Sequence, residues 1–217
     1  MFPVADINRA RRPAVMVRLL VAANALVFLL ELGLSKPELQ ELFYRFGFVP
    51  KFFWADPLGH AYTLFTSMFL HGGFAHILGN MWFLWVFGDN VEDRLGSGRF
   101  LLFYLLGGAA AALAQGLMDP GSTQPMIGAS GAVSAVLGAY YKLFPKAPVL
   151  TMVLLFFYPV FFYLPAWFYL GYWAFLQFIE ALMGVPGIAF WAHLGGFLYG
   201  VFAVRWFLST KPRWIRW

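Results

Sequence analysis

Long uncharged, apolar runs alternate with short charged segments along most of this sequence. The runs that lie between neighbouring charges cover residues 57–88, 100–118, 120–141, 147–179 and 181–204. Most of them exceed the roughly 18 residues that indicate a membrane-spanning helix, because crossing about 30 Å of hydrocarbon at 1.5 Å per residue takes about 20 residues. The pattern therefore predicts several membrane-spanning helices.

The breaks between these runs predict an all-α, polytopic membrane protein with six spans and a long outer loop, 35–70, between the first two. Pro159 and Pro165 interrupt the long apolar run after residue 147, so we expect a membrane-embedded lead-in there before the fifth span. The six predicted spans are about 17–34, 73–90, 100–117, 130–144, 165–183 and 190–208.

Composition supports a membrane protein and narrows the chemistry. The chain is 61% hydrophobic and 12% charged, whereas an ordinary soluble domain is about 25% charged. Cysteine is absent, which excludes a disulfide framework and thiolate chemistry and leaves serine as the default nucleophile.

The net charge of +5 is better explained by membrane topology than by nucleic acid, because the basic residues lie at the ends of the predicted spans and form no basic stripe. With six spans and both termini cytoplasmic, 12 of the 15 Lys and Arg residues lie on the inner side. We therefore expect a basic cytoplasmic leader (1–16), a membrane domain (17–209) and a basic cytoplasmic tail (210–217).

Ser130 and His193 are polar residues at the start of the fourth and sixth predicted spans, and this topology places both in the outer part of the membrane. Each begins a stripe of small residues that lets two membrane helices approach closely. An ionisable residue inside a membrane indicates function by default. We therefore predict a dyad in which Ser130 attacks a carbonyl and His193 accepts its proton. The first stripe consists of Ser130, Ser134 and Gly138, with Gly131 beside it. The second stripe consists of His193, Gly196 and Gly200.

A second polar cluster opens the second predicted span. His76 and Asn80 are one helical turn apart on the same face, and His71 lies just before them in the entry loop. A His N–H and an Asn amide are suitable donors to the oxyanion of a tetrahedral intermediate. We predict this role for His76 and Asn80, with His71 in support.

A zinc site is the alternative interpretation of the histidines, since His71, His76 and His193 could supply three nitrogen ligands. No His-Glu-x-x-His motif is present, so metal is the weaker prediction, and we expect no cofactor. No acid has a spacing that places it beside His193, although Asp119 and Glu180 could each approach it.

These motifs resemble those of the rhomboid intramembrane serine proteases over most of the chain. Gly128-Ala129-Ser130-Gly131 is similar to the family's Gly-x-Ser-Gly, Ala192-His193 with Gly196 to its Ala-His-x-x-Gly, and His71, His76 and Asn80 to its second-helix pattern.

The resemblance implies a six-helix core, a water-filled cavity that opens outward, and hydrolysis of peptide bonds near the outer face of the membrane. It implies Ser130 as nucleophile, His193 as general base, and an oxyanion hole made by His76, Asn80 and the Ser130 backbone N–H. The fifth helix and the segment 183–190 resemble the family's mobile gate and cap.

Two positions depart from the family pattern. Tyr62-Thr63 stands roughly where several members have Trp-Arg in the outer loop, and Ser134 stands where many have a tyrosine that stacks on the histidine. Another aromatic residue, such as Trp191 or Phe197, would then have to orient His193.

We expect the partners to be transmembrane protein substrates and the lipid bilayer, not nucleic acid, and the location to be a prokaryotic cell (inner) membrane. The alternatives are an inactive rhomboid-like protein that binds membrane helices and a His-based, metal-dependent membrane hydrolase. The sequence leaves the oligomeric state open.

Overall fold

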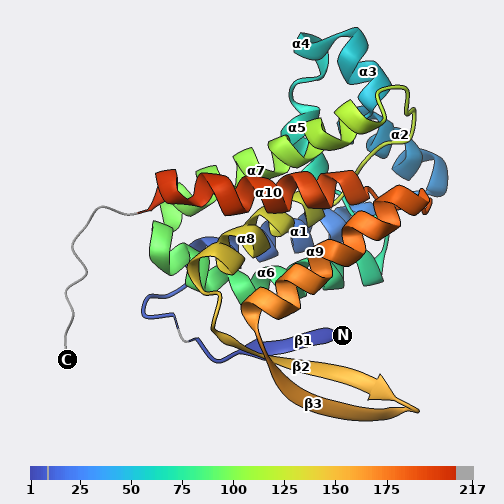
Figure 1. Cartoon of the computed structure of the whole chain (residues 1–217). Helices are drawn as coiled ribbons and strands as arrows, with labels where there is room; N and C mark the ends of the chain where they lie inside the picture. Colours follow the sequence, from blue (N-terminus) through green and yellow to red (C-terminus); the bar gives the residue numbers. More distant parts are fainter. Residues whose placement is uncertain (9, 209–217) are drawn as a thin grey trace.

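A helix lies at each of the six predicted spans. The computed structural model describes residues 1–8 and 10–208 (Figure 1), so the predicted tail, 210–217, lies outside the described residues, as does position 209. The six helices are α1 (Val15–Glu31), α6 (Phe74–Leu95), α7 (Ser97–Met118), α8 (Ser130–Leu143), α9 (Ala166–Met183) and α10 (Phe190–Phe207).

Judged by length and composition alone, one helix of the described residues, α7, is long and apolar enough to cross a membrane. Six crossings therefore stay a prediction. The expected outer loop is itself largely helical (Figure 1), because it consists of four short helices and a 3₁₀ turn. These are α2 (Lys36–Phe46), α3 (Pro50–Ala55), α4 (Pro57–His60), α5 (Thr63–Thr66) and η1 (Ser67–Phe69).

α8 lies near the middle of the helical bundle, in contact with α6, α7, α9 and α10 (Figure 1). Small residues on these helices allow the backbones to approach closely. A methyl group added to Gly200 on α10 would overlap the carbonyl oxygen of Ala135 on α8, and one added to Gly138 on α8 would overlap that of Phe197. The contact between α8 and α10 is therefore close to backbone against backbone.

A buried carboxylate from α6 caps the start of α1. Glu92 accepts hydrogen bonds from the backbone N–H groups of Met16 and Val17, both at 2.9 Å, and from the Ser97 hydroxyl. The first N–H groups of a helix lack acceptors within the helix, and a carboxylate there also interacts favourably with the helix dipole. This one side chain ties α1, α6 and α7 together.

The prediction of an all-α fold is wrong in one region, because a three-stranded antiparallel sheet is present. The strands are β1 (Phe2–Asp6), β2 (Pro148–Leu155) and β3 (Tyr158–Pro165), in the order β1-β2-β3. The segment expected to be a membrane-embedded lead-in is thus a β-hairpin. Its β-branched and aromatic residues favour strands, and Pro159 is tolerated because β3 is an edge strand.

The predicted leader supplies β1, which pairs with β2 and lies against α6. Asp6 accepts hydrogen bonds from the Tyr140 hydroxyl (2.5 Å) and the Asn90 amide (2.8 Å), and the Trp82 indole donates to the Pro3 carbonyl. Burial raises the pKa of Asp6 to about 7. In Figure 1 the sheet lies below α6 and α9, with the hairpin turn pointing away from the helices.

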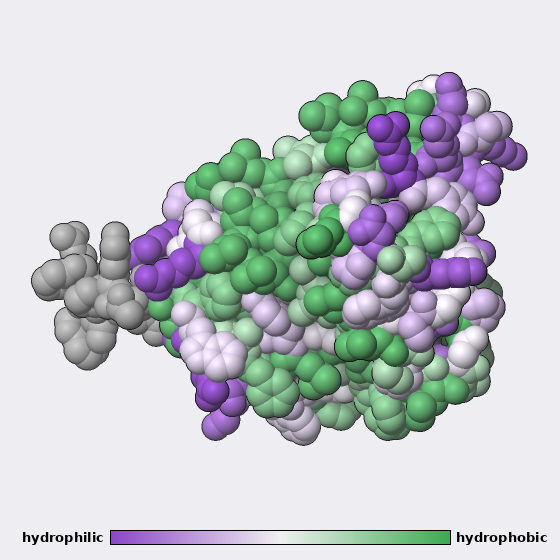
Figure 2. Space-filling view, turned by 90° about the horizontal axis from the view of Figure 1, so that it is seen from above, coloured by the Kyte–Doolittle hydropathy of each residue, from purple (hydrophilic) through white to green (hydrophobic). Residues whose placement is uncertain are grey.

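Apolar side chains cover much of the outer surface. Figure 2 shows hydrophobic residues over the middle of the helical body on the face it presents, with hydrophilic residues gathered mainly toward its ends. On α10, Leu198, Phe202 and Trp206 recur every four residues and are each more than half exposed. Such a continuous apolar surface suits contact with lipid rather than with water.

The close contact of α8 and α10 predicts that Gly200→Ala destabilises the protein. The added methyl group would meet backbone atoms of Ala135 and Ala139, which cannot rotate away. We expect a loss of about 1–3 kcal/mol in the free energy of unfolding, measured by thermal or denaturant unfolding in detergent. Gly98→Ala is the matched control, because nothing lies within 4 Å of the added atom; equal stability of the two variants would contradict the prediction.

Candidate active site

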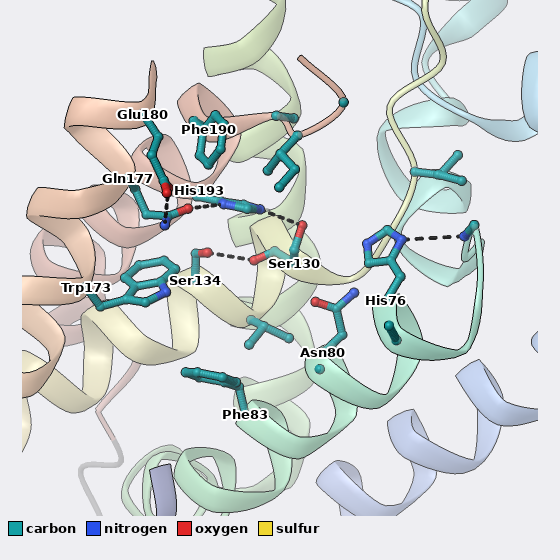
Figure 3. Close-up of a pocket in the computed structure, with 18 of the residues that line it drawn as sticks. His76, Asn80, Phe83, Ser130, Ser134, Trp173, Gln177, Glu180, Phe190 and His193 are labelled. Atoms are coloured by element: carbon teal, nitrogen blue, oxygen red, sulfur yellow. Dashed lines mark hydrogen bonds between the residues drawn. The ribbon is translucent and has the colours of Figure 1, made fainter. Parts of the chain in front are cut away.

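Ser130, His193, His76 and Asn80 line one cavity of about 850 Å³ between α6, α8, α9 and α10, whereas the other predicted site residues do not line it. Ser130 and His193 lie toward one another across it, and His76 and Asn80 come from α6 on the other side of Ser130 (Figure 3). His71 is fully buried beneath this group. The structure therefore brings together side chains from three separate helices.

Ser130 is the first residue of α8, and the chain turns sharply just before it. Gly128 has φ +112°, a conformation that residues with a side chain rarely adopt, and its N–H donates to the Ser67 carbonyl at 2.9 Å. The first N–H groups of a helix have no acceptor within the helix. The Ser130 hydroxyl thus lies beside the electropositive end of α8.

The His193 ring is within hydrogen-bonding distance of Ser130. The distance from His193 Nε2 to Ser130 Oγ is 2.9 Å. Glycine makes this approach possible, since a methyl group on Gly196 would overlap the Gly131 carbonyl one residue after the serine. Gly196 therefore allows α8 and α10 into contact at the level of Ser130 and His193, whereas Gly131 allows α7 to approach α8, because a methyl group there would overlap Ala111.

His76 and Asn80 direct nitrogen atoms at the backbone just before Ser130. A methyl group built on Gly128 would lie 2.5 Å from His76 Nε2 and 3.4 Å from Asn80 Nδ2. The Gly72 N–H points at His76 Nδ1, 3.5 Å away, and a neutral ring that accepts at Nδ1 carries its hydrogen on Nε2. His76 Nε2 and Asn80 Nδ2, which face the backbone beside the serine, are then both hydrogen-bond donors.

His71 and Glu31 support this pair from below. The Asn80 amide nitrogen lies 3.1 Å from His71 Nε2, and the His71 backbone N–H donates to the Glu31 carboxylate at 3.2 Å. One amide hydrogen of Asn80 is thereby engaged, and the second remains for the cavity. Glu31, at the end of α1, was not singled out from the sequence.

The groups that hold His193 differ from those expected. Gln177 Oε1 lies 2.5 Å from His193 Nδ1, and the rings of Trp173 and Phe190 lie 6.2 and 6.1 Å from the imidazole, centre to centre. The two aromatic candidates proposed from the sequence have other contacts: Trp191 packs on Phe178, and Phe197 packs on Trp173 and Tyr141.

Of the two acids considered, Glu180 lines the cavity and Asp119 does not. Glu180 reaches the imidazole only through Gln177, whose amide nitrogen is 3.3 Å from the carboxylate. One sequence signal could have identified this set. Trp173, Gln177 and Glu180 are spaced i, i+4, i+7 in α9 and therefore share one face of an otherwise apolar helix.

The zinc interpretation has no support in the described residues, among which no group of three or more His, Asp or Glu side chains is placed to share a metal ion. His76 and Asn80 instead face the serine backbone.

Comparison with known proteins assigns the family. The Rhomboid domain family model matches residues 58–210. Rhomboid protease GluP of Bacillus subtilis is 43% identical over 81 residues, covering 37% of this chain and 15% of that protein. The human presenilin-associated rhomboid-like protein, mitochondrial, is 28% identical over 189 residues, covering 85% of this chain and 46% of that protein.

This chain belongs to the rhomboid family. Rhomboids are integral membrane proteins, and the family includes serine proteases. Rhomboid protein 1, mitochondrial, of Saccharomyces cerevisiae is 36% identical over 103 residues, covering 45% of this chain and 28% of that protein. The chain thus spans less than half the length of each of these relatives.

The turn before the serine predicts that Gly128→Ala damages the site. The methyl group would require a strained φ and would press on His76 Nε2. We expect a loss of about 1–3 kcal/mol in stability from the backbone alone, together with displacement of the His76 ring visible in a crystal structure. Gly121→Ala, in the loop before α8, is the control, because nothing lies within 4 Å of the added atom. It should leave both the stability and the position of the His76 ring unchanged.

Proposed function

We propose that this chain is an intramembrane serine endopeptidase that hydrolyses peptide bonds in or near the transmembrane segments of membrane proteins. One observation carries the proposal: Ser130 Oγ lies 2.9 Å from His193 Nε2 at the start of α8, within a cavity. A serine and a histidine at this distance form the nucleophile and base of acyl-transfer enzymes.

The proposed reaction begins when Ser130 Oγ attacks the scissile carbonyl carbon and His193 Nε2 accepts the hydroxyl proton. The negative charge that develops on the carbonyl oxygen is stabilised by N–H groups of His76, Asn80 and the Ser130 backbone. The imidazolium then gives its proton to the leaving amine, and the acyl group stays on the serine. Water, deprotonated by His193, releases the second product and restores the dyad.

The short central helix supports chemistry below the membrane surface. α8 has 14 residues, or about 21 Å at 1.5 Å per residue, whereas the hydrocarbon is about 30 Å thick. In the proposed six-span topology, with both termini on the cytoplasmic side, α8 runs outward-to-inward from Ser130. A serine at the outer end of a helix this short would lie recessed from the outer surface, in a cavity that admits water.

A substrate helix must unwind before its amides become accessible, because a membrane-embedded helix keeps them hydrogen-bonded. We therefore propose substrates with Gly, Pro or polar residues near their outer end. Entry beside α9 is supported by its packing, since its only buried residues are Ala166, Tyr169 and Leu170, all at its first turns. The segment 183–190 at the end of α9, which is exposed over 183–188, would then act as a cap.

A prokaryotic cell (inner) membrane stays a prediction for the location, because the relatives include both a bacterial protein and mitochondrial ones. The alternative function is that of an inactive rhomboid-like protein that binds membrane helices. The paired serine and histidine favour the protease, since binding alone would require neither.

Cleavage of a transmembrane substrate in liposomes tests the proposal directly. We expect the wild-type protein to cut the substrate, and Ser130→Ala and His193→Ala to lower the rate by about 10⁴- to 10⁶-fold. Ser122→Ala and His60→Ala, which change the same residue types outside the cavity, should cleave at the wild-type rate. Cleavage by Ser130→Ala at the wild-type rate would exclude the serine mechanism, and binding without cleavage by the wild type would favour the alternative.

The proposed oxyanion hole makes a separate prediction. Asn80→Ala should lower kcat by about 10²- to 10³-fold with little change in KM, because the donor acts mainly on the charge that develops in the transition state. Asn90→Ala, the same change three turns along α6, removes a contact to Asp6 and should lower stability but not kcat. An unchanged kcat in a folded Asn80→Ala variant would remove Asn80 from the mechanism.

A further inference from the structure

We infer that Gln177 is the positioning residue that holds the His193 ring for catalysis, an inference that rests on the proposed function. Gln177 Oε1 contacts His193 Nδ1, and the other ring nitrogen contacts the Ser130 hydroxyl. An amide oxygen can only accept a hydrogen bond, so the hydrogen of the neutral ring lies on Nδ1. Nε2 is then left with the lone pair that accepts the serine proton.

Glu180 fixes which end of the Gln177 amide faces the histidine. The Gln177 Nε2 group donates to Glu180 Oε2 at 3.3 Å, one turn further along α9, and this bond directs Oε1 toward the ring. Figure 3 shows the resulting chain of side chains, from Ser130 through His193 and Gln177 to Glu180. A flipped amide would place its N–H₂ group against Nδ1 and would select the unproductive tautomer.

The proton balance is simple in this arrangement. Ser130 Oγ loses its proton to His193 Nε2 as the C–O bond to the substrate forms, and the ring becomes an imidazolium with hydrogens on both nitrogens. Gln177 is neutral and takes up no proton, so the positive charge stays on the ring until Nε2 gives its proton to the leaving amine. The bond from Nδ1–H to Gln177 strengthens while the ring is charged.

The position of Gln177 makes its hydrogen bond to His193 depend on how α9 packs against α10. The buried residues of α9 lie in its first two turns, and Gln177 lies in the half-exposed outer part of the helix. The side-chain contacts that join the part of α9 beyond these turns to α10 are those of Gln177 with His193, of Trp173 with His193 and Phe197, and of Phe178 with Trp191. Movement of the outer part of α9 away from α10 would release the histidine, and the dyad would be oriented again only when α9 returns.

Nitrogen-15 NMR of histidine-labelled protein in detergent reports the tautomer without requiring turnover. The chain has four histidines, and His193→Ala assigns the signals of interest. In the wild type at neutral pH we expect His193 to carry hydrogen on Nδ1. Gln177→Leu, which keeps the size but removes the acceptor, should give a mixture of the two neutral tautomers, while Gln124→Leu, an exposed loop residue, should match the wild type.

The kinetics of substrate cleavage provide a second test of the role of Gln177. Gln177→Leu should lower kcat by about 10- to 100-fold at nearly constant KM, the range for a hydrogen bond to a charged group. The double variant Gln177→Glu/Glu180→Gln restores an acceptor at position 177 and a donor at position 180 without placing two carboxylates in contact, so it should recover most of the rate. Its carboxylate also favours the imidazolium, so the acid limb of the kcat profile should move to higher pH, by about one unit or more.

An unchanged His193 tautomer in Gln177→Leu would overturn the inference. A loss of rate both in Gln177→Leu and in the double variant Gln177→Glu/Glu180→Gln would also overturn it, because that result indicates a structural role. Failure of the proposed function can be distinguished from failure of the inference about Gln177. A wild-type protein that does not cleave would refute the proposed protease activity. The NMR spectra need no cleavage, so they would still show whether Gln177 determines the tautomer of His193.

Discussion

The close contact between the backbones of α8 and α10 is the constraint on which the rest of this structure depends. Gly138 on α8 and Gly196 and Gly200 on α10 have no room for a side chain, because carbonyl groups of the facing helix occupy that space. Two helices at this distance bring Ser130 and His193 within hydrogen-bonding reach. A wider separation would leave both residues in place along the chain but out of contact.

α6 and α9 complete the site from opposite sides of this contact. α6 supplies nitrogen donors that face the backbone before the serine, and α9 supplies an acceptor for the far nitrogen of the histidine. Polar groups in an apolar interior carry a large desolvation cost unless they are hydrogen-bonded. The hydrogen bonds between Asn80 Nδ2 and His71 Nε2 and between Gln177 and His193 meet this requirement for the atoms that form them, and they also orient Asn80 and the His193 ring.

Much of the helical framework and the contact between Ser130 and His193 could be predicted from the sequence. Apolar runs of sufficient length locate helices, and Ser130, His193, His76 and Asn80 are conspicuous because polar residues are rare there. The hairpin was not predicted, because an apolar run of β-branched and aromatic residues is compatible with a membrane segment as well as with strands. The hairpin also pairs through β2 with β1, which is more than 140 residues away along the chain, so local sequence does not indicate that partner.

By itself, the sequence determined which residues are available for chemistry and which helices carry them, since both follow from local composition and from the 3.6-residue period of a helix. Only the tertiary structure decided how His193 is held. The ring is placed by Gln177, Trp173 and Phe190, and two of these lie on α9, a helix whose distance from α10 depends on packing between segments. Spacing along one chain carries no information about that distance, so the partner of the histidine became visible only when the helices were assembled.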